Sequence, residues 1–154
     1  MADVVDKATR SRMMSGIRGK DTKPEITLRK GLFARGFRFR LHAKNLPGKP
    51  DIVFPRLKSV ILVHGCFWHR HDCTLFRWPS SNVEFWKEKI AKNREVDART
   101  RLGLHSLDWK ILTIWECSMK GPDRIGAEEV VTRAAAWLTS DSGDDEISGV
   151  RRMP

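Results

Sequence analysis

The segment HGCFWHRHDC, residues 64–73, constrains the fold of this chain more than any other feature of its sequence. It holds three of the five histidines and two of the three cysteines. It directly follows the apolar run VILV at residues 60–63, so the cluster begins where a buried strand is expected to end. Many thiol and imidazole groups with little apolar surface are typical of a loop held by a metal ion.

Three apolar runs predict strands of one sheet, at residues 51–54 (DIVF), 60–63 and 110–115 (KILTIW). Residues 37–41 alternate apolar and basic side chains, as an exposed strand does. Between these runs lie segments with helical signals. The order helix, strands, helix, strand, helix predicts an α/β domain with a mixed sheet and helices on both faces.

The expected helices have recognisable starts. Thr22 is a candidate N-cap with Glu25 three residues further on, and this helix should end before Gly36. A similar pattern at residues 81–84 predicts a long basic helix that ends near Gly103. The last helix is amphipathic and is marked by Val130, Val131, Ala134 and Leu138.

The cysteines and histidines have the spacing of a metal site. Cys66, His69, His71 and Cys73 follow one another as C-x2-H-x-H-x-C, and Cys117 follows the third apolar run. If the second and third runs are neighbouring strands, Cys117 can meet Cys66. Three thiolates and one imidazole would form a closed structural zinc site, although the spacing does not choose between His69 and His71. The alternative is small buried cysteines beside surface histidines.

A second constellation suits metal-assisted hydrolysis. Asp51 begins one predicted strand and His64 ends the next, so both should lie at one rim of the sheet. Glu25 shares the inward face of its helix with Leu28 and Leu32, and a carboxylate there needs a partner. Two carboxylates suit Mg²⁺, and a histidine could take a proton from water. The ordinary alternatives are a turn-capping Asp51, a helix-capping Glu25 and a core His64.

The net charge of +10 favours a polyanionic partner, with nucleic acid first. Phe67 and Trp68 lie inside the cysteine and histidine segment, and Trp86 lies near the start of the basic helix. Apolar side chains beside positive charge can wedge between bases of DNA, whereas core packing is the alternative for each.

The 154 residues fit one domain. We expect a basic N-terminal arm at residues 1–20, a folded domain at 21–138 and a disordered tail at 139–154. No apolar run is long enough to cross a membrane, and the N-terminus lacks the apolar centre of a signal peptide. A cytoplasmic protein with reduced thiols is therefore expected.

Several segments are similar to those of one enzyme family, the very-short-patch repair endonucleases, or DNA mismatch endonucleases. These segments are DKATRSRMM, LPGKPDIVF, HGCFWHRHDC, EFWKEKIAKN and IWEC. The resemblance covers residues 1–138 and implies a type II restriction endonuclease-like core. It makes residues 1–20 a DNA-contacting arm and residues 21–138 a nuclease domain. It also implies an enzyme that nicks duplex DNA on the 5′ side of the T in a T·G mismatch. Such mismatches arise by deamination of 5-methylcytosine, which links the family to a DNA cytosine methyltransferase and to general mismatch-repair proteins. A monomer is expected, because cutting one strand needs one active site.

The resemblance also implies roles for individual residues. Asp51 and the backbone carbonyl of Val63 would bind Mg²⁺, and His69 would be the general base. His64 and Glu25 would contact the scissile phosphate or the water bound to the metal. The implied zinc ligands are Cys66, His71, Cys73 and Cys117.

The implied DNA contacts are the aromatic wedge of Phe67, Trp68 and Trp86, with Met14 entering from the other groove. Lys89 and Asn93 are candidate readers of the major groove, because they lie on the basic helix.

Two departures leave alternatives open. Residue 63 is Val where the best-known members have Thr, and the sequence Val63-His64-Gly65 lacks the acid-x-Lys motif of the wider nuclease superfamily. The alternatives are a related restriction-like nuclease that cuts matched duplex and a non-catalytic, zinc-stabilised DNA-binding module.

Overall fold

The computed structural model describes residues 22–150 of the protein. The predicted N-terminal arm, with Met14, lies outside the described residues. The helices and strands are α2 (Lys23–Ala34), β1 (Arg40–Leu41), β2 (Ile52–Phe54), β3 (Ser59–His64), α3 (Val83–Ser106), β4 (Lys110–Trp115), α4 (Ala127–Leu138) and β5 (Asp145–Ile147). Short 3-10 turns follow β2 and β4, at Pro55–Leu57 and Glu116–Ser118.

The five strands form one mixed sheet in the order β1-β2-β3-β4-β5. Strands β1, β2 and β3 pair antiparallel, whereas β3, β4 and β5 pair parallel. Strand β3 is paired with β4 along its whole length, and His64 lies opposite Trp115. The mixed sheet expected from the apolar runs is confirmed.

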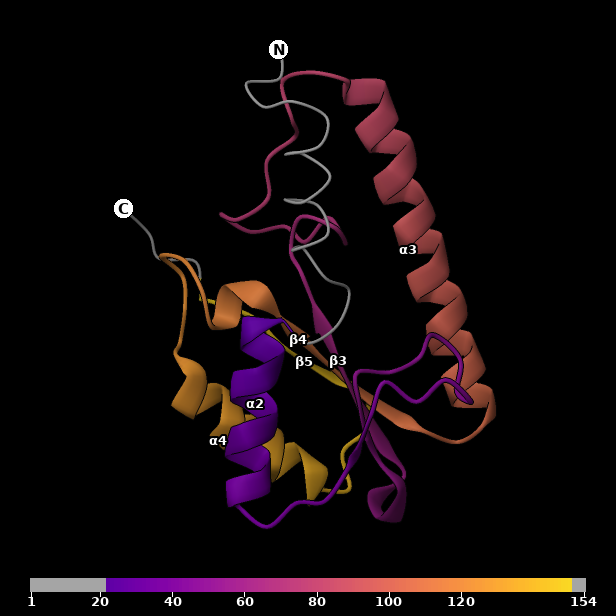
Figure 1. The fold of residues 1–154 in the computed structure, drawn as a ribbon, viewed down its shortest axis with the longest axis vertical. Coiled ribbons are helices and arrows are strands. Elements are labelled where there is room, and N and C mark those ends of the chain that lie inside the picture. Colours follow the sequence, from indigo (N-terminus) through magenta and orange to yellow (C-terminus); the bar gives the residue numbers. More distant parts are fainter. Residues whose placement is uncertain (1–21, 151–154) are drawn as a thin grey trace, which may run out of the picture.

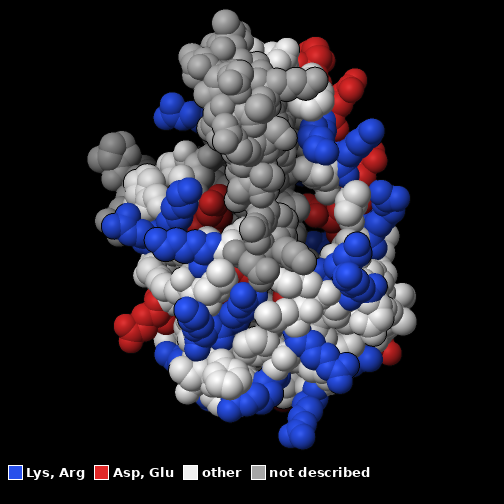
Figure 2. All heavy atoms as spheres, viewed as in Figure 1, with Lys and Arg blue, Asp and Glu red and all other residues white. Residues whose placement is uncertain are grey.

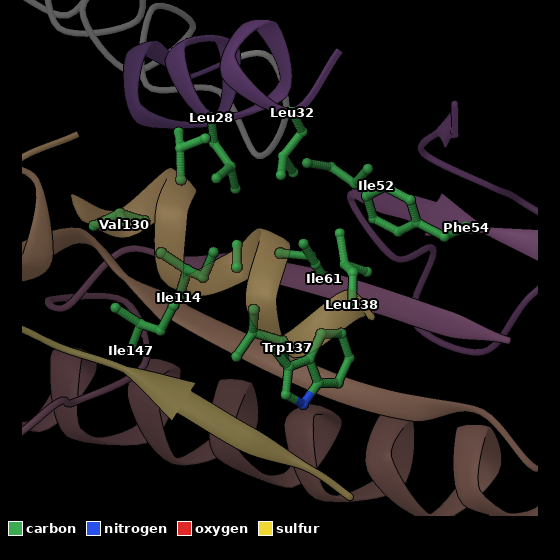
Figure 3. Packing of buried hydrophobic residues seen from close by; sticks show 13 residues of the cluster. Leu28, Leu32, Ile52, Phe54, Ile61, Ile114, Val130, Trp137, Leu138 and Ile147 are labelled. Atoms are coloured by element: carbon green, nitrogen blue, oxygen red, sulfur yellow. The ribbon is translucent and has the colours of Figure 1, made fainter. Parts of the chain in front are cut away.

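Helices cover both faces of the sheet, with α2 and α4 on one side and α3 on the other (Figure 1). Figure 3 shows Leu28 and Leu32 pointing from α2 into the layer shared with α4 and the sheet. On the other face, Leu104 of α3 packs with Val60 and Ile111. Each face therefore has its own apolar cluster, because the central strands are buried on both sides.

The helix starts differ in how they are capped. The side chain of Thr22 accepts a hydrogen bond from the backbone N–H of Glu25, so the predicted cap of α2 is confirmed. The capping box predicted for α3 is wrong. Its N-cap is Asn82, with φ of 54° and no side-chain hydrogen bond to the helix, and the helix runs past Gly103 to Ser106.

The C-terminal segment corrects the expectation of disorder after residue 138. Residues Asp145–Ile147 form β5, which pairs with β4. Ile147 is the one apolar residue of this strand, and it is buried in the same cluster as residues of α2 and α4. One apolar residue and a partner strand therefore outweigh the polar composition of this segment. Within residues 22–150, no helix combines the length and apolar composition that a membrane span needs.

Candidate active site and metal centre

The cysteine and histidine cluster forms just beyond the paired ends of β3 and β4. Parallel strands end at the same edge of a sheet, so Cys66 and Cys117, each two residues past a strand end, meet there. The Nδ1 atom of His71 lies 3.6 Å from Sγ of Cys66 and 3.5 Å from Sγ of Cys117. With Cys73, these residues place one ligand atom each within 4.8 Å of the others.

The donor set fits a structural zinc ion. Three thiols and one imidazole match the ligands that zinc takes in closed tetrahedral sites. Burial raises the pKa of the Cys66 and Cys117 thiols, so a cation is needed to hold them as thiolates. Burial also lowers the pKa of His71, which favours the neutral imidazole that a metal ligand must be. The spacing left His69 and His71 open, and the structure places His71 in this cluster.

A second group lies where β2 begins and contains Glu25, His42 and Asp51. The His42 ring lies between the carboxylates, with Nε2 3.8 Å from Oε2 of Glu25 and Nδ1 3.9 Å from Oδ1 of Asp51. Glu25 is buried, as its place on the inward face of α2 predicted. Sequence reasoning missed His42, although it directly follows a predicted strand, as His64 does.

Asp51 is anchored to β3 by its side chain. Its Oδ2 accepts a hydrogen bond of 2.7 Å from the backbone N–H of Val63. Burial, with the neighbouring Glu25 carboxyl group, raises the pKa of Asp51 to about 8. The hydrogen bond opposes this rise. A nearby divalent cation would favour the ionised carboxylate and relieve the cost of burying it.

His64 and His69 lie side by side in the same region. Their rings stack in parallel, with centroids 3.8 Å apart and planes inclined by 5°. Burial and the neighbouring His69 lower the pKa of His64 to about 3, so His64 is neutral near pH 7. Its buried Nδ1 has no hydrogen-bond partner within residues 22–150. Such an atom is suited to a ligand or an ordered water.

Asp97 of α3 is a site residue that sequence reasoning missed. Its Oδ2 lies 2.6 Å from Nδ1 of His69. The signal was present in the inward stripe of α3, which carries Trp86, Ile90, Asn93, Asp97, Thr100 and Leu104 at helical spacing. A carboxylate on such a stripe needs a partner, which is the same reasoning that singled out Glu25.

A cleft of about 530 Å³ joins the region of Asp51 to that of the two stacked histidines. Asp51, Val63, His64, His69 and Asp97 all line it, together with Lys44 and Lys49 on the turn before β2. Gly48, with φ of 72°, brings that turn directly against Thr100 of α3, where a side chain would clash. Carboxyl, imidazole and ammonium groups therefore face one cavity.

The predicted aromatic wedge forms a cluster beside the metal centre. The Phe67 ring contacts Trp68 and Trp86, with centroids 5.2 Å and 5.4 Å apart. Trp68 and Trp86 are 5.8 Å apart. The Asn93 side chain donates a 3.0 Å hydrogen bond to the carbonyl of Trp68, so it ties this loop to α3. The structure thus brings Phe67 and Trp68 of the loop together with Trp86 of α3.

The surface charge suits a polyanion. Figure 2 shows Lys and Arg side chains over much of the visible face, and both basic and acidic side chains along the edge on the side of α3. Lys89 is exposed on α3, as the sequence predicted. The predicted DNA-facing helix exposes both signs of charge, with basic residues in excess.

Carboxyl groups and paired histidines in one cleft, with a basic surround, suit an enzyme class, the hydrolases that cleave nucleic-acid phosphodiesters. Comparisons with known proteins agree. The profile of the family described as DNA mismatch endonuclease Vsr matches residues 2–75. DNA mismatch endonuclease Vsr of Escherichia coli (strain K12) is 42% identical over 147 residues, which are 96% of this chain and 94% of that protein.

Two further relatives are described as nicking enzymes. Type II nicking enzyme V.NmeAIP of Neisseria meningitidis serogroup A is 44% identical over 78% of this chain and 86% of its own. Type II nicking enzyme V.XorIIP of Xanthomonas oryzae pv. oryzae is 42% identical over 77% of this chain and 88% of its own. The chain belongs to the DNA mismatch endonuclease Vsr family.

Proposed function

We propose that this protein nicks one strand of duplex DNA on the 5′ side of the T in a T·G mismatch, by Mg²⁺-assisted hydrolysis, and so starts very-short-patch repair. The observation that carries the proposal is the single cleft that Asp51, His64 and His69 line together. The relatives support it, because their names describe mismatch endonucleases and nicking enzymes. The proposal includes a restriction endonuclease-like core.

In this mechanism, His69 is the general base. A carboxylate can only accept a hydrogen bond, so the contact with Asp97 places the ring proton of His69 on Nδ1. The other ring nitrogen, Nε2, is then free to take a proton from the attacking water. His64, as a neutral ring, and Glu25 would contact the scissile phosphate or the water bound to the metal.

Asp51 and the carbonyl of Val63 would hold Mg²⁺, which would supply a Lewis acid that polarises a phosphate oxygen. The structure supports this role through Asp51, a buried carboxyl group that burial holds protonated until pH about 8. Val63 replaces the Thr of the best-known members at little cost, because the proposed ligand is a backbone atom.

Recognition of the mismatch would rest on the aromatic cluster. Phe67, Trp68 and Trp86 would enter the duplex beside the mismatch, while Lys89 would face the major groove. Asn93, expected from the sequence to read the groove with Lys89, instead donates to the carbonyl of Trp68 and would position the aromatic loop. Met14 would enter from the opposite groove. Zinc bound by the cysteine and histidine cluster would hold the aromatic loop in place. The protein would act as a monomer, in concert with a DNA cytosine methyltransferase and mismatch-repair proteins.

The deciding experiment is a nicking assay with Mg²⁺ on end-labelled duplexes. The duplexes differ only in a T·G pair against matched T·A and C·G pairs, in several flanking sequences, and both strands are followed. A single cut 5′ of the mismatched T is the expected result. Cutting of both strands of matched DNA would instead indicate a restriction-like nuclease. Tight binding without cleavage would indicate a zinc-stabilised DNA-binding module.

A further inference from the structure

We propose that the C-terminal segment 145–150 is a strap that completes the zinc centre, with the backbone N–H of Gly149 as a positioning group for the Cys117 thiolate. This inference rests on the zinc content proposed above. It assigns a role to a segment for which the sequence predicted only disorder.

The strap donates directly to a ligand sulfur. The N–H of Gly149 points at Sγ of Cys117 with an N···S distance of 3.2 Å. Within the cluster, the N–H of Cys117 donates in turn to Sγ of Cys66 at 3.3 Å. Two of the three sulfurs therefore accept a backbone hydrogen bond, and one of these bonds comes from a segment outside the ligand loops.

The sheet delivers Gly149 to this position. Ile147 of β5 pairs with Ile114 of β4 in parallel register, so the chain beyond Ile147 runs beside the residues that lead to Cys117. The Ile147 side chain is buried in the main core and fixes that register. Gly149 thus reaches the metal centre because β5 belongs to the sheet.

Asp123 fastens the strap at a second point. Its backbone carbonyl accepts a hydrogen bond of 2.8 Å from the N–H of Val150. Its buried carboxylate accepts one of 2.7 Å from the hydroxyl of Thr74, which follows the ligand Cys73. Asp123 therefore joins the end of the strap to the loop that carries Cys73.

There is no room for a side chain at residue 149. A Cβ atom there would lie 2.6 Å from the carbonyl oxygen of Cys117 and 2.7 Å from that of Asp123. The backbone can approach the sulfur only because the residue is glycine. Hydrogen bonds to a thiolate reduce its charge and fix its orientation, and loss of such an outer contact typically lowers metal affinity about 10–100-fold.

The test compares Gly149→Ala with Gly143→Ala in the full-length protein. Gly143 lies just before the strap, and a Cβ atom there would have no neighbour within 4 Å. Zinc content is measured first, and then the rate of zinc release to a chromogenic chelator. Gly149→Ala should release zinc about tenfold faster than the wild type or more, while Gly143→Ala should match the wild type.

A cobalt spectrum and a second variant distinguish loss of the hydrogen bond to the Cys117 thiolate from a general loss of stability. In the cobalt-substituted proteins, the thiolate-to-cobalt charge-transfer band should shift in Gly149→Ala and stay in place in Gly143→Ala. If Gly149→Ala does not fold, Thr74→Val removes the hydroxyl bond to Asp123 with little change in volume. It should also speed zinc release.

The outcomes distinguish the strap from the zinc centre itself. Zinc in the wild type, with unchanged release in both Gly149→Ala and Thr74→Val, would overturn the strap and leave the centre standing. The same holds if a folded Gly149→Ala keeps both the release rate and the cobalt band of the wild type. A wild type purified without zinc, and unable to take it up, would overturn the centre and the strap together.

Discussion

Nδ1 of His69 and Oδ2 of Asp97 lie 2.6 Å apart, across the gap between the cysteine and histidine loop and helix α3. The pair fixes both the orientation and the tautomer of the ring, because the carboxylate accepts only from a protonated nitrogen. The His69 ring also stacks on His64. The general base of the proposed mechanism is therefore held from two directions by residues of different elements.

Asp97→Asn should lower the rate of nicking about 10²-fold or more, with little effect on DNA binding. An amide can donate to Nδ1 and so favour the wrong tautomer of His69. Single-turnover kinetics with saturating enzyme, alongside a binding titration, would measure both quantities. Glu95→Gln is the matched control, since Glu95 is exposed on the same helix. Equal rates in the two variants would remove Asp97 from the mechanism.

Asp51 should make the stability of the Mg²⁺-free protein depend on pH. Its pKa is about 3.9 in an unfolded chain and is raised to about 8 by burial in the fold. Between these values the folded state keeps a proton that the unfolded state has lost. The stability from neutral Asp51 is therefore present at low pH and is lost as pH rises through about 8.

Melting temperatures from pH 5 to pH 9 would test this expectation. The wild type should lose stability toward the alkaline end, and added Mg²⁺ should restore it there. Asp51→Asn should be less dependent on pH in this range and insensitive to Mg²⁺. Asp141→Asn, which changes an exposed carboxylate, should behave as the wild type. A wild type that shows no Mg²⁺ effect at pH 9 would contradict the proposed ligand.

Local signals explain how much of the fold could be predicted. The run at residues 110–115 is apolar along its whole length, and β4 has those bounds. The Thr22 cap was equally readable, since a cap involves residues only three apart. The cap of α3 was not, because Asn82 adopts a left-handed conformation that the residue pattern of a capping box does not reveal.

Long-range geometry explains what could not be predicted. The choice between His69 and His71 depends on the backbone at Arg70, which lies between them and has a left-handed conformation with φ of 48°. The His69 ring lies against Asp97, whereas the His71 ring lies against the cysteines. His71 is further held by its backbone hydrogen bond to Cys66. The place of β5 depends likewise on β4, about 30 residues away in the sequence. Residue spacing predicts neither the placement of the two histidine rings nor the pairing of β5 with β4.

Cys117→Ser should remove zinc and lower stability together. Cys117 and Cys66 form a small cluster with Trp115, and the described residues around it add only Cys73 and Leu75. With so little apolar packing, the metal would contribute about 3 kcal/mol or more, which is on the order of 10 °C in melting temperature for a domain of this size. Zinc analysis and calorimetry would check both. An unchanged melting temperature would contradict a structural role for the metal.

Trp68→Ala should weaken binding to mismatched DNA more than binding to matched DNA. Base stacking on an aromatic ring is worth about 1–3 kcal/mol, which corresponds to about 5–150-fold in affinity. Phe67 touches Trp68, so the double variant should lose less than the two single losses combined.

Fluorescence titrations of T·G and T·A duplexes with the two single variants and the double variant give this coupling directly. Phe33→Ala is the control, because Phe33 is 54% exposed and lies on α2, on the opposite face of the sheet from α3. It should bind both duplexes as the wild type does. Equal losses on T·G and T·A duplexes in Trp68→Ala would show that the ring contributes to general DNA affinity, since a wedge at the mismatch must favour the base pair that is easier to open.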